Sequence, residues 1–203
     1  MTAILINAGT THQEKKGEPF CMEVLTRCLI ILCTALAIVL SSTAVCDGKW
    51  LIADGRKMFG LWNICTLEAV VEETAPPNCT AYPALQVVAV SLGLCRCAVS
   101  LAVVGAIFGL ELLVISRVSD GQDSHKRWSL GSALLLVAAA LSAVGVVVFV
   151  ALLWQHITPF GFTLPFWCQF TAVFLLFLNG ASARHIHHMV EQTMPPGGHM
   201  GKI

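Results

Sequence analysis

Residues 130–154 read LGSALLLVAAALSAVGVVVFVALLW and contain no charged side chain. A helix over this stretch would be about 37 Å long at 1.5 Å per residue, enough to cross the roughly 30 Å hydrocarbon core of a bilayer. Trp128 and Trp154 bracket the stretch, as interfacial anchors do. Over the whole chain, 56% of residues are hydrophobic, only 12% are charged, and the mean hydropathy is +0.77. So little charge could not cover a water-soluble fold of this size, and we expect an integral membrane protein.

Three further apolar runs, at 24–45, 85–116 and 165–183, are also long enough to cross a bilayer as helices. With 130–154 they predict an all-α membrane domain over residues 24–183, built as a four-transmembrane-helix bundle. An N-tail (1–23) and a C-tail (184–203) flank this domain. The longest connection between spans is loop 46–84.

The distribution of basic residues predicts the orientation of the bundle. Eight Lys and Arg residues lie in or beside the N-tail, the segment 117–127 and the C-tail, against three in loop 46–84 and none in 155–164. Because basic residues accumulate on the cytoplasmic side, we expect both termini of this multi-pass protein to lie in the cytoplasm. The membrane we expect it to occupy is the plasma membrane. Asn78-Cys79-Thr80 is a glycosylation sequon, and it falls in the loop predicted to lie outside the cell.

Loop 46–84 has the pattern of a small extracellular antiparallel β-sheet. Apolar and aromatic residues at 50–53 and 58–62 flank Asp54-Gly55, a common hairpin turn. Cys65 and Cys79 follow on the oxidising side of the membrane. A disulfide between them would close about 15 residues and contribute roughly 3 kcal/mol in the chain-entropy model. Since so small a sheet has no core of its own, we expect this disulfide.

A combination of residues in this loop resembles a known superfamily. Directly after the first span come Trp50, Gly60-Leu61-Trp62, Cys65 and Cys79. This set is similar to the first loop of claudins, peripheral myelin protein and calcium-channel gamma subunits. A closer resemblance, to the voltage-dependent calcium-channel gamma-like subunits, extends over all four spans through the stretches CDGKWL (46–51), FGLW (59–62), AIFGLE (106–111), GFTL (161–164) and FLLFLN (174–179).

The resemblance implies a claudin-like fold and a role as an auxiliary subunit that lowers or reshapes calcium-channel current. The implied partner is the pore-forming subunit of a voltage-gated calcium channel, contacted within the lipid bilayer by lateral helix packing. The alternative is a claudin-like structural adhesion or barrier protein. Against the alternative, loop 46–84 is shorter than a typical claudin's, and the interval from Cys65 to Cys79 is longer.

Two charged residues, Arg96 and Glu111, interrupt the second span. They are separated by roughly 22 Å of helix, so they cannot pair with each other. We expect Arg96 to extend toward the extracellular sheet and bond its backbone carbonyls. Glu111 is open to two interpretations, a bond inside the protein or a contact with a partner subunit. Gly105 and Gly109 form a GxxxG, which we expect to pack against the third span.

Other function classes lack support in the sequence. The formal net charge is zero, which gives no indication of nucleic-acid binding. No Cys/His grouping has zinc spacing, and no catalytic set or nucleophile motif is present. We therefore expect no enzyme activity, no metal or other cofactor, and no small-molecule substrate.

Overall fold

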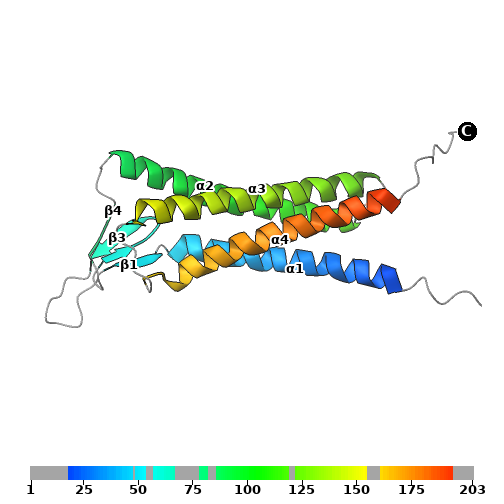
Figure 1. Cartoon of the computed structure of the whole chain (residues 1–203), viewed down its shortest axis with the longest axis horizontal. Helices are drawn as coiled ribbons and strands as arrows, with labels where there is room; N and C mark the ends of the chain where they lie inside the picture. The colour runs from blue at the N-terminus through cyan, green and yellow to red at the C-terminus, as the bar shows by residue number, and fades with distance from the viewer. Residues whose placement is uncertain are drawn as a thin grey trace, which may run out of the picture.

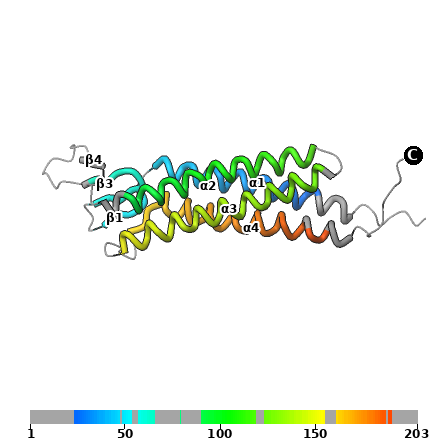
Figure 2. The backbone as a smooth tube through the Cα atoms, turned by 90° about the horizontal axis from the view of Figure 1, so that it is seen from above, coloured from blue at the N-terminus to red at the C-terminus, as the bar shows by residue number. Residues whose placement is uncertain are grey.

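Four long helices form the body of the protein. The computed structural model describes residues 18–47, 49–53, 57–66, 78–81, 86–118, 122–154 and 161–193. The helices are α1 (Glu18–Asp47), α2 (Gln86–Val118), α3 (Gln122–Leu152) and α4 (Leu164–Thr193). They run side by side along the long axis of the molecule, with a small sheet at one end (Figure 1). We call this the sheet end, and the opposite one, where α1 begins and α4 ends, the tail end (Figure 2).

All four helices contain segments long and apolar enough to cross a membrane, so the chain is a multi-pass membrane protein. All four helices continue past the predicted spans at the tail end, where α1 begins at Glu18, α2 ends at Val118, α3 begins at Gln122 and α4 ends at Thr193. The added turns contain charged residues such as Lys126, Arg127 and Arg184, and Lys and Arg are good helix formers that need no apolar surroundings. Where the membrane boundaries fall along the helices stays a prediction. The outer parts of both predicted tails, 1–17 and 194–203, lie outside the described residues.

Close packing between α2 and α3 is the most extensive contact in the bundle, and α4 packs against both α3 and α1. Glycines make the α2–α3 approach possible. A Cβ atom on Gly131 would lie 3.0 Å from the carbonyl oxygen of Gly109, and one on Gly105 would lie 3.8 Å from the Cβ of Ala138. The GxxxG of α2 therefore packs inside the protein against α3, as expected.

The small sheet has four antiparallel strands in the order β1-β2-β3-β4. They are β1 (Leu51–Ala53), β2 (Lys57–Phe59), β3 (Asn63–Thr66) and β4 (Asn78–Ala81). Strands β1 and β2 form the expected hairpin, in which Leu51 faces Phe59 and Ala53 faces Lys57. The Asp54-Gly55 turn lies outside the described residues.

Two groups of buried side chains hold the fold together. One joins the sheet to the neighbouring parts of α2, α3 and α4, with Trp50, Leu61, Leu92 and Phe149 among its members. The other lies in the half of the bundle nearer the tail end. The sheet has no separate core, since its inward side chains belong to the same cluster as those of the helices.

We expect the substitution Gly131→Ala to destabilise the bundle, because its methyl group would meet the backbone oxygen of Gly109, which cannot rotate away. Overpacking of this kind costs about 1–3 kcal/mol. The matched control is Gly93→Ala in α2, where a Cβ would meet nothing within 4 Å. Both variants gain the same helix propensity. The difference between their melting temperatures in mild detergent therefore measures the cost of crowding the added methyl group against α2. We expect Gly131→Ala to melt several degrees lower, at about 2–4 °C per kcal/mol; equal melting temperatures would contradict the packing.

Candidate functional site

Trp50, just before β1, is fully buried where the sheet meets three helices. Its Nε1 donates a hydrogen bond to the carbonyl oxygen of Ala44 in α1 at 2.8 Å. Its ring packs edge-on against Phe149 of α3 and Phe166 of α4, with centroid distances of 4.9 and 6.1 Å. Each such aromatic pair contributes about 0.5–1.5 kcal/mol beyond its buried area. Trp50 therefore fixes the sheet to α1, α3 and α4 at once.

The outer edge of β1 pairs with the segment 161–163, which leads into α4. The Ile52 N–H donates to Gly161 O at 2.8 Å, and the Thr163 N–H donates to Trp50 O at 3.1 Å. Leu51 and Phe162 form an isolated antiparallel bridge. This contact covers a strand edge that would otherwise be open. This pairing is not predictable from the sequence, because a three-residue segment is too short to show a strand period.

Arg96 of α2 holds the Gly60-Leu61-Trp62 turn. Its Nε donates to Leu61 O at 2.6 Å, and its Nη2 donates to Trp62 O at 3.2 Å. Its guanidinium carbon lies 5.3 Å from the ring centre of Trp62, a cation–π contact. The Trp62 indole in turn donates to Val45 O of α1 at 3.0 Å. The expected contact between Arg96 and the sheet carbonyls is thus present, and the turn is held from both α1 and α2.

A disulfide joins Cys65 of β3 to Cys79 of β4, the pair proposed from the sequence. The two residues face each other in the register of the sheet. The bond therefore attaches β4, the strand farthest from β1, to the rest of the sheet. Asn78 is the first residue of β4, and its side chain lies outside the described part of the structure. Cys46 at the end of α1 is a free thiol.

A hydrogen-bonded group inside the bundle was missed by the sequence analysis. Gln169 of α4 is fully buried; its Oε1 accepts from Ser41 Oγ of α1 at 3.0 Å, and its Nε2 donates to Ser142 Oγ of α3. A lone glutamine in an apolar span is the signal that could have revealed it. Because polar groups in a membrane need internal partners, these bonds link three helices.

Glu111 is an exposed carboxylate on α2 that forms no hydrogen bond or ion pair with another described residue. Its height along the bundle axis follows from the contact between Gly109 of α2 and Gly131 of α3, which places these two glycines at the same height. Toward the tail end, Glu111 is about 3 Å beyond Gly109, and Trp128 is about 4.5 Å beyond Gly131, at 1.5 Å per residue. Glu111 is therefore almost level with Trp128. Of the two interpretations, the bond inside the protein has no support among the described residues.

Trp128 marks a level at which three helices are tied together near the tail end. Its indole donates to Ala183 O of α4 at 2.8 Å. The guanidinium carbon of Arg27 in α1 lies 4.9 Å from its ring centre. Trp128 therefore links α1, α3 and α4 near the tail end, and Trp50 contacts the same three helices at the sheet end.

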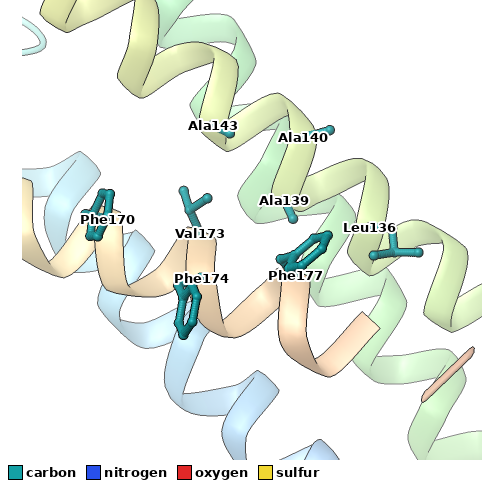
Figure 3. Close-up of a pocket in the computed structure, with 8 residues that line it drawn as sticks. All are labelled: Leu136, Ala139, Ala140, Ala143, Phe170, Val173, Phe174 and Phe177. Atoms are coloured by element: carbon teal, nitrogen blue, oxygen red, sulfur yellow. The ribbon is translucent and has the colours of Figure 1, made fainter. Parts of the chain in front are cut away.

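An apolar groove runs between α3 and α4 on the outside of the bundle. One part of this groove has a volume of about 430 Å³. Figure 3 shows that part with Phe170, Val173, Phe174 and Phe177 on α4, opposite Leu136, Ala139, Ala140 and Ala143 on α3. A second hollow of about 490 Å³ continues it toward Trp154 and Trp167, sharing Phe170. We call the two together the α3–α4 groove.

We expect Arg96→Gln to destabilise the sheet end, because a buried carbonyl loses its charged donor. Hydrogen bonds to charged groups contribute about 1.5–3 kcal/mol. Arg117→Gln is the matched control, since Arg117 is an exposed residue at the other end of the same helix. Thermal unfolding in detergent and the fraction of protein at the cell surface should both fall for Arg96→Gln relative to Arg117→Gln. Equal values for the two variants would show that Arg96 does not support the sheet.

Comparison with known proteins is consistent with this arrangement. The sequence profile of the voltage-dependent calcium channel gamma-like subunit protein family matches residues 8–191, which include α1, α2, α3, the sheet and all but the last two residues of α4. The chain is also similar to the human voltage-dependent calcium channel gamma-like subunit, with 44% identity over 187 residues that cover 92% of this chain and 96% of the human protein. The chain therefore belongs to the voltage-dependent calcium channel gamma-like subunit family.

Proposed function

We propose that this protein is an auxiliary subunit of a voltage-gated calcium channel in the plasma membrane. It modulates the amplitude of the current, or its steady-state inactivation, through lateral contacts with the pore-forming subunit. The observation that carries the proposal is the family match over residues 8–191. That family is named for channel subunits, not for a catalytic activity.

The outer surface of the bundle supports a mechanism based on lateral contact. Large apolar side chains are exposed along the helices, among them Leu101 and Phe108 of α2 and Phe170 and Phe174 of α4. A subunit shifts a channel between states only if it binds one state more tightly than another. A twofold to tenfold change in state occupancy requires about 0.4–1.4 kcal/mol of differential contact. A few helix contacts are enough to supply that.

The orientation proposed from the sequence places the sheet outside the cell and both termini in the cytoplasm. Five basic residues lie within three turns of the helix ends at the tail end: Arg27, Arg117, Lys126, Arg127 and Arg184. Their clustering at one end supports a cytoplasmic location for that end. Asn78 in β4 then lies at the opposite, extracellular end, where N-glycosylation sites are used.

We expect Asn78 to carry an N-glycan when the chain is expressed in cells that glycosylate. Treatment with an N-glycosidase should lower the apparent mass on a gel. Thr80→Ala should remove that shift without altering Asn78, and Thr80→Ser should retain it. A band that glycosidase leaves unchanged would argue against both the site and the orientation.

We expect co-expression with a high-voltage-activated calcium channel to change its peak current or the voltage dependence of its inactivation. The measurement is a whole-cell recording with and without the chain, with surface labelling to confirm that it reaches the plasma membrane. An unchanged calcium current with the chain at the surface would contradict the proposal. Enrichment at cell contacts or altered transepithelial resistance would then favour the claudin-like adhesion or barrier role.

A further inference from the structure

The outward face of α2 presents one continuous row of exposed residues. Its buried residues include Val99, Ala102, Ala106, Gly109 and Leu113, which repeat at intervals of three and four. The exposed residues on the opposite side repeat in the same way. We call this row the α2 seam: Leu94, Cys97, Leu101, Val104, Phe108 and Glu111.

The spacing of the α2 seam suits packing against another helix. Its members alternate at steps of three and four, so the row repeats every seven residues. A seven-residue repeat keeps one row of side chains in contact with a partner helix that crosses at about +20°. Many pairs of membrane helices pack at this angle. The α2 seam could therefore contact a single partner helix over four turns or more.

Glu111 adds a charge to this otherwise apolar row. The members nearest to it, Val104 and Phe108, are exposed and apolar. A carboxylate at this position has no partner among the described residues, although ionisable side chains on membrane helices normally face a partner or water. It lies almost level with Trp128, seven residues before α2 ends at Val118, and therefore near the tail end of the bundle. A transmembrane helix of another protein commonly carries Lys or Arg at its cytoplasmic interface, where it would lie opposite Glu111.

A second copy of this chain fits the α2 seam poorly. Two copies in one membrane have the same orientation, so their α2 helices would be parallel. A two-fold dimer would place each seam residue near its own equivalent. The two Glu111 carboxylates would then lie close together and repel each other. The negative charge of Glu111 therefore favours a different protein, one that carries a basic residue, as the partner of the α2 seam.

From this geometry we infer that the α2 seam is the surface that contacts the pore-forming subunit, and that Glu111 pairs with a Lys or Arg on one of its transmembrane helices. The inference rests on the proposed function and specifies the face and the charge of the partner. The outward side of α3 offers a comparison surface, because its exposed residues Val137, Val144 and Val147 carry no charge.

Photo-crosslinking tests which face meets the channel. A photoreactive amino acid is placed at Val104 in the α2 seam, or at Val144 on the exposed side of α3, and the chain is co-expressed with the pore-forming subunit. Val104 and Val144 are 47% and 56% exposed, so both positions are accessible. We expect a covalent adduct with the pore-forming subunit from position 104 and none from position 144. An adduct from position 144 alone would overturn the inference.

Acid-to-amide substitutions test the charge. We expect Glu111→Gln to reduce co-purification of the pore-forming subunit about tenfold, the effect of losing one close charge pair, and Glu111→Lys to reduce it further. Asp123→Asn is the matched control, because Asp123 is an exposed carboxylate in the first turn of α3, away from the α2 seam. A basic-to-acidic change at the crosslinked helix of the channel should restore binding of Glu111→Lys.

The outcomes separate the two proposals. Suppose that the unmodified chain alters the current but Glu111→Gln co-purifies the pore-forming subunit as well as Asp123→Asn does. The assignment of the α2 seam as the contact surface is then wrong, while the modulatory function stands. If the unmodified chain does not alter the current, and the chain with the photoreactive residue at position 104 forms no adduct with the pore-forming subunit, both proposals are wrong. Equal melting temperatures of the Glu111→Gln and Asp123→Asn variants confirm that the comparison reports on contact and not on folding.

Discussion

The burial of Trp50 between the sheet and three helices is the constraint on which the sheet end depends. Strands of three or four residues cannot hold their shape alone, and this sheet shares its core with the bundle. The Trp50 indole bonds to α1, and its ring packs on α3 and α4. Arg96 adds the missing connection to α2. With all four helices attached, the sheet and the bundle form one packed unit.

Internal packing of this kind leaves large apolar side chains exposed on the outer faces of the helices. Glycines and alanines bring α2 close to α3, and Gln169 links α1, α3 and α4. The apolar rows that remain on the outside are surfaces that lipid or another helix must cover. The α2 seam carries a charge and the α3–α4 groove does not, which gives the bundle chemically distinct sides. A subunit with distinct sides can favour one state of a neighbouring channel if its contacts differ between states.

The sequence was sufficient for the helices, the β1–β2 hairpin and the Cys65–Cys79 pair, because each has a local pattern. Arg96 was placed correctly, since a charge near the end of a span can reach backbone carbonyls outside it. The bridge from Leu51 to Phe162 and the bonds around Gln169 were not predicted. Both join residues more than a hundred positions apart or on different helices, where no periodicity connects them. The α3–α4 groove also depends on how two helices diverge, and a single sequence does not contain that information.

The central claim is that this chain acts as a subunit of a calcium channel. The most direct test is affinity purification of the endogenous protein from native membranes in mild detergent, followed by mass spectrometry of everything that remains bound. We expect the pore-forming subunit of a voltage-gated calcium channel to be recovered with it in near-equal amount. Recovery of the chain alone, or with cell-junction proteins in place of a channel, would contradict the account.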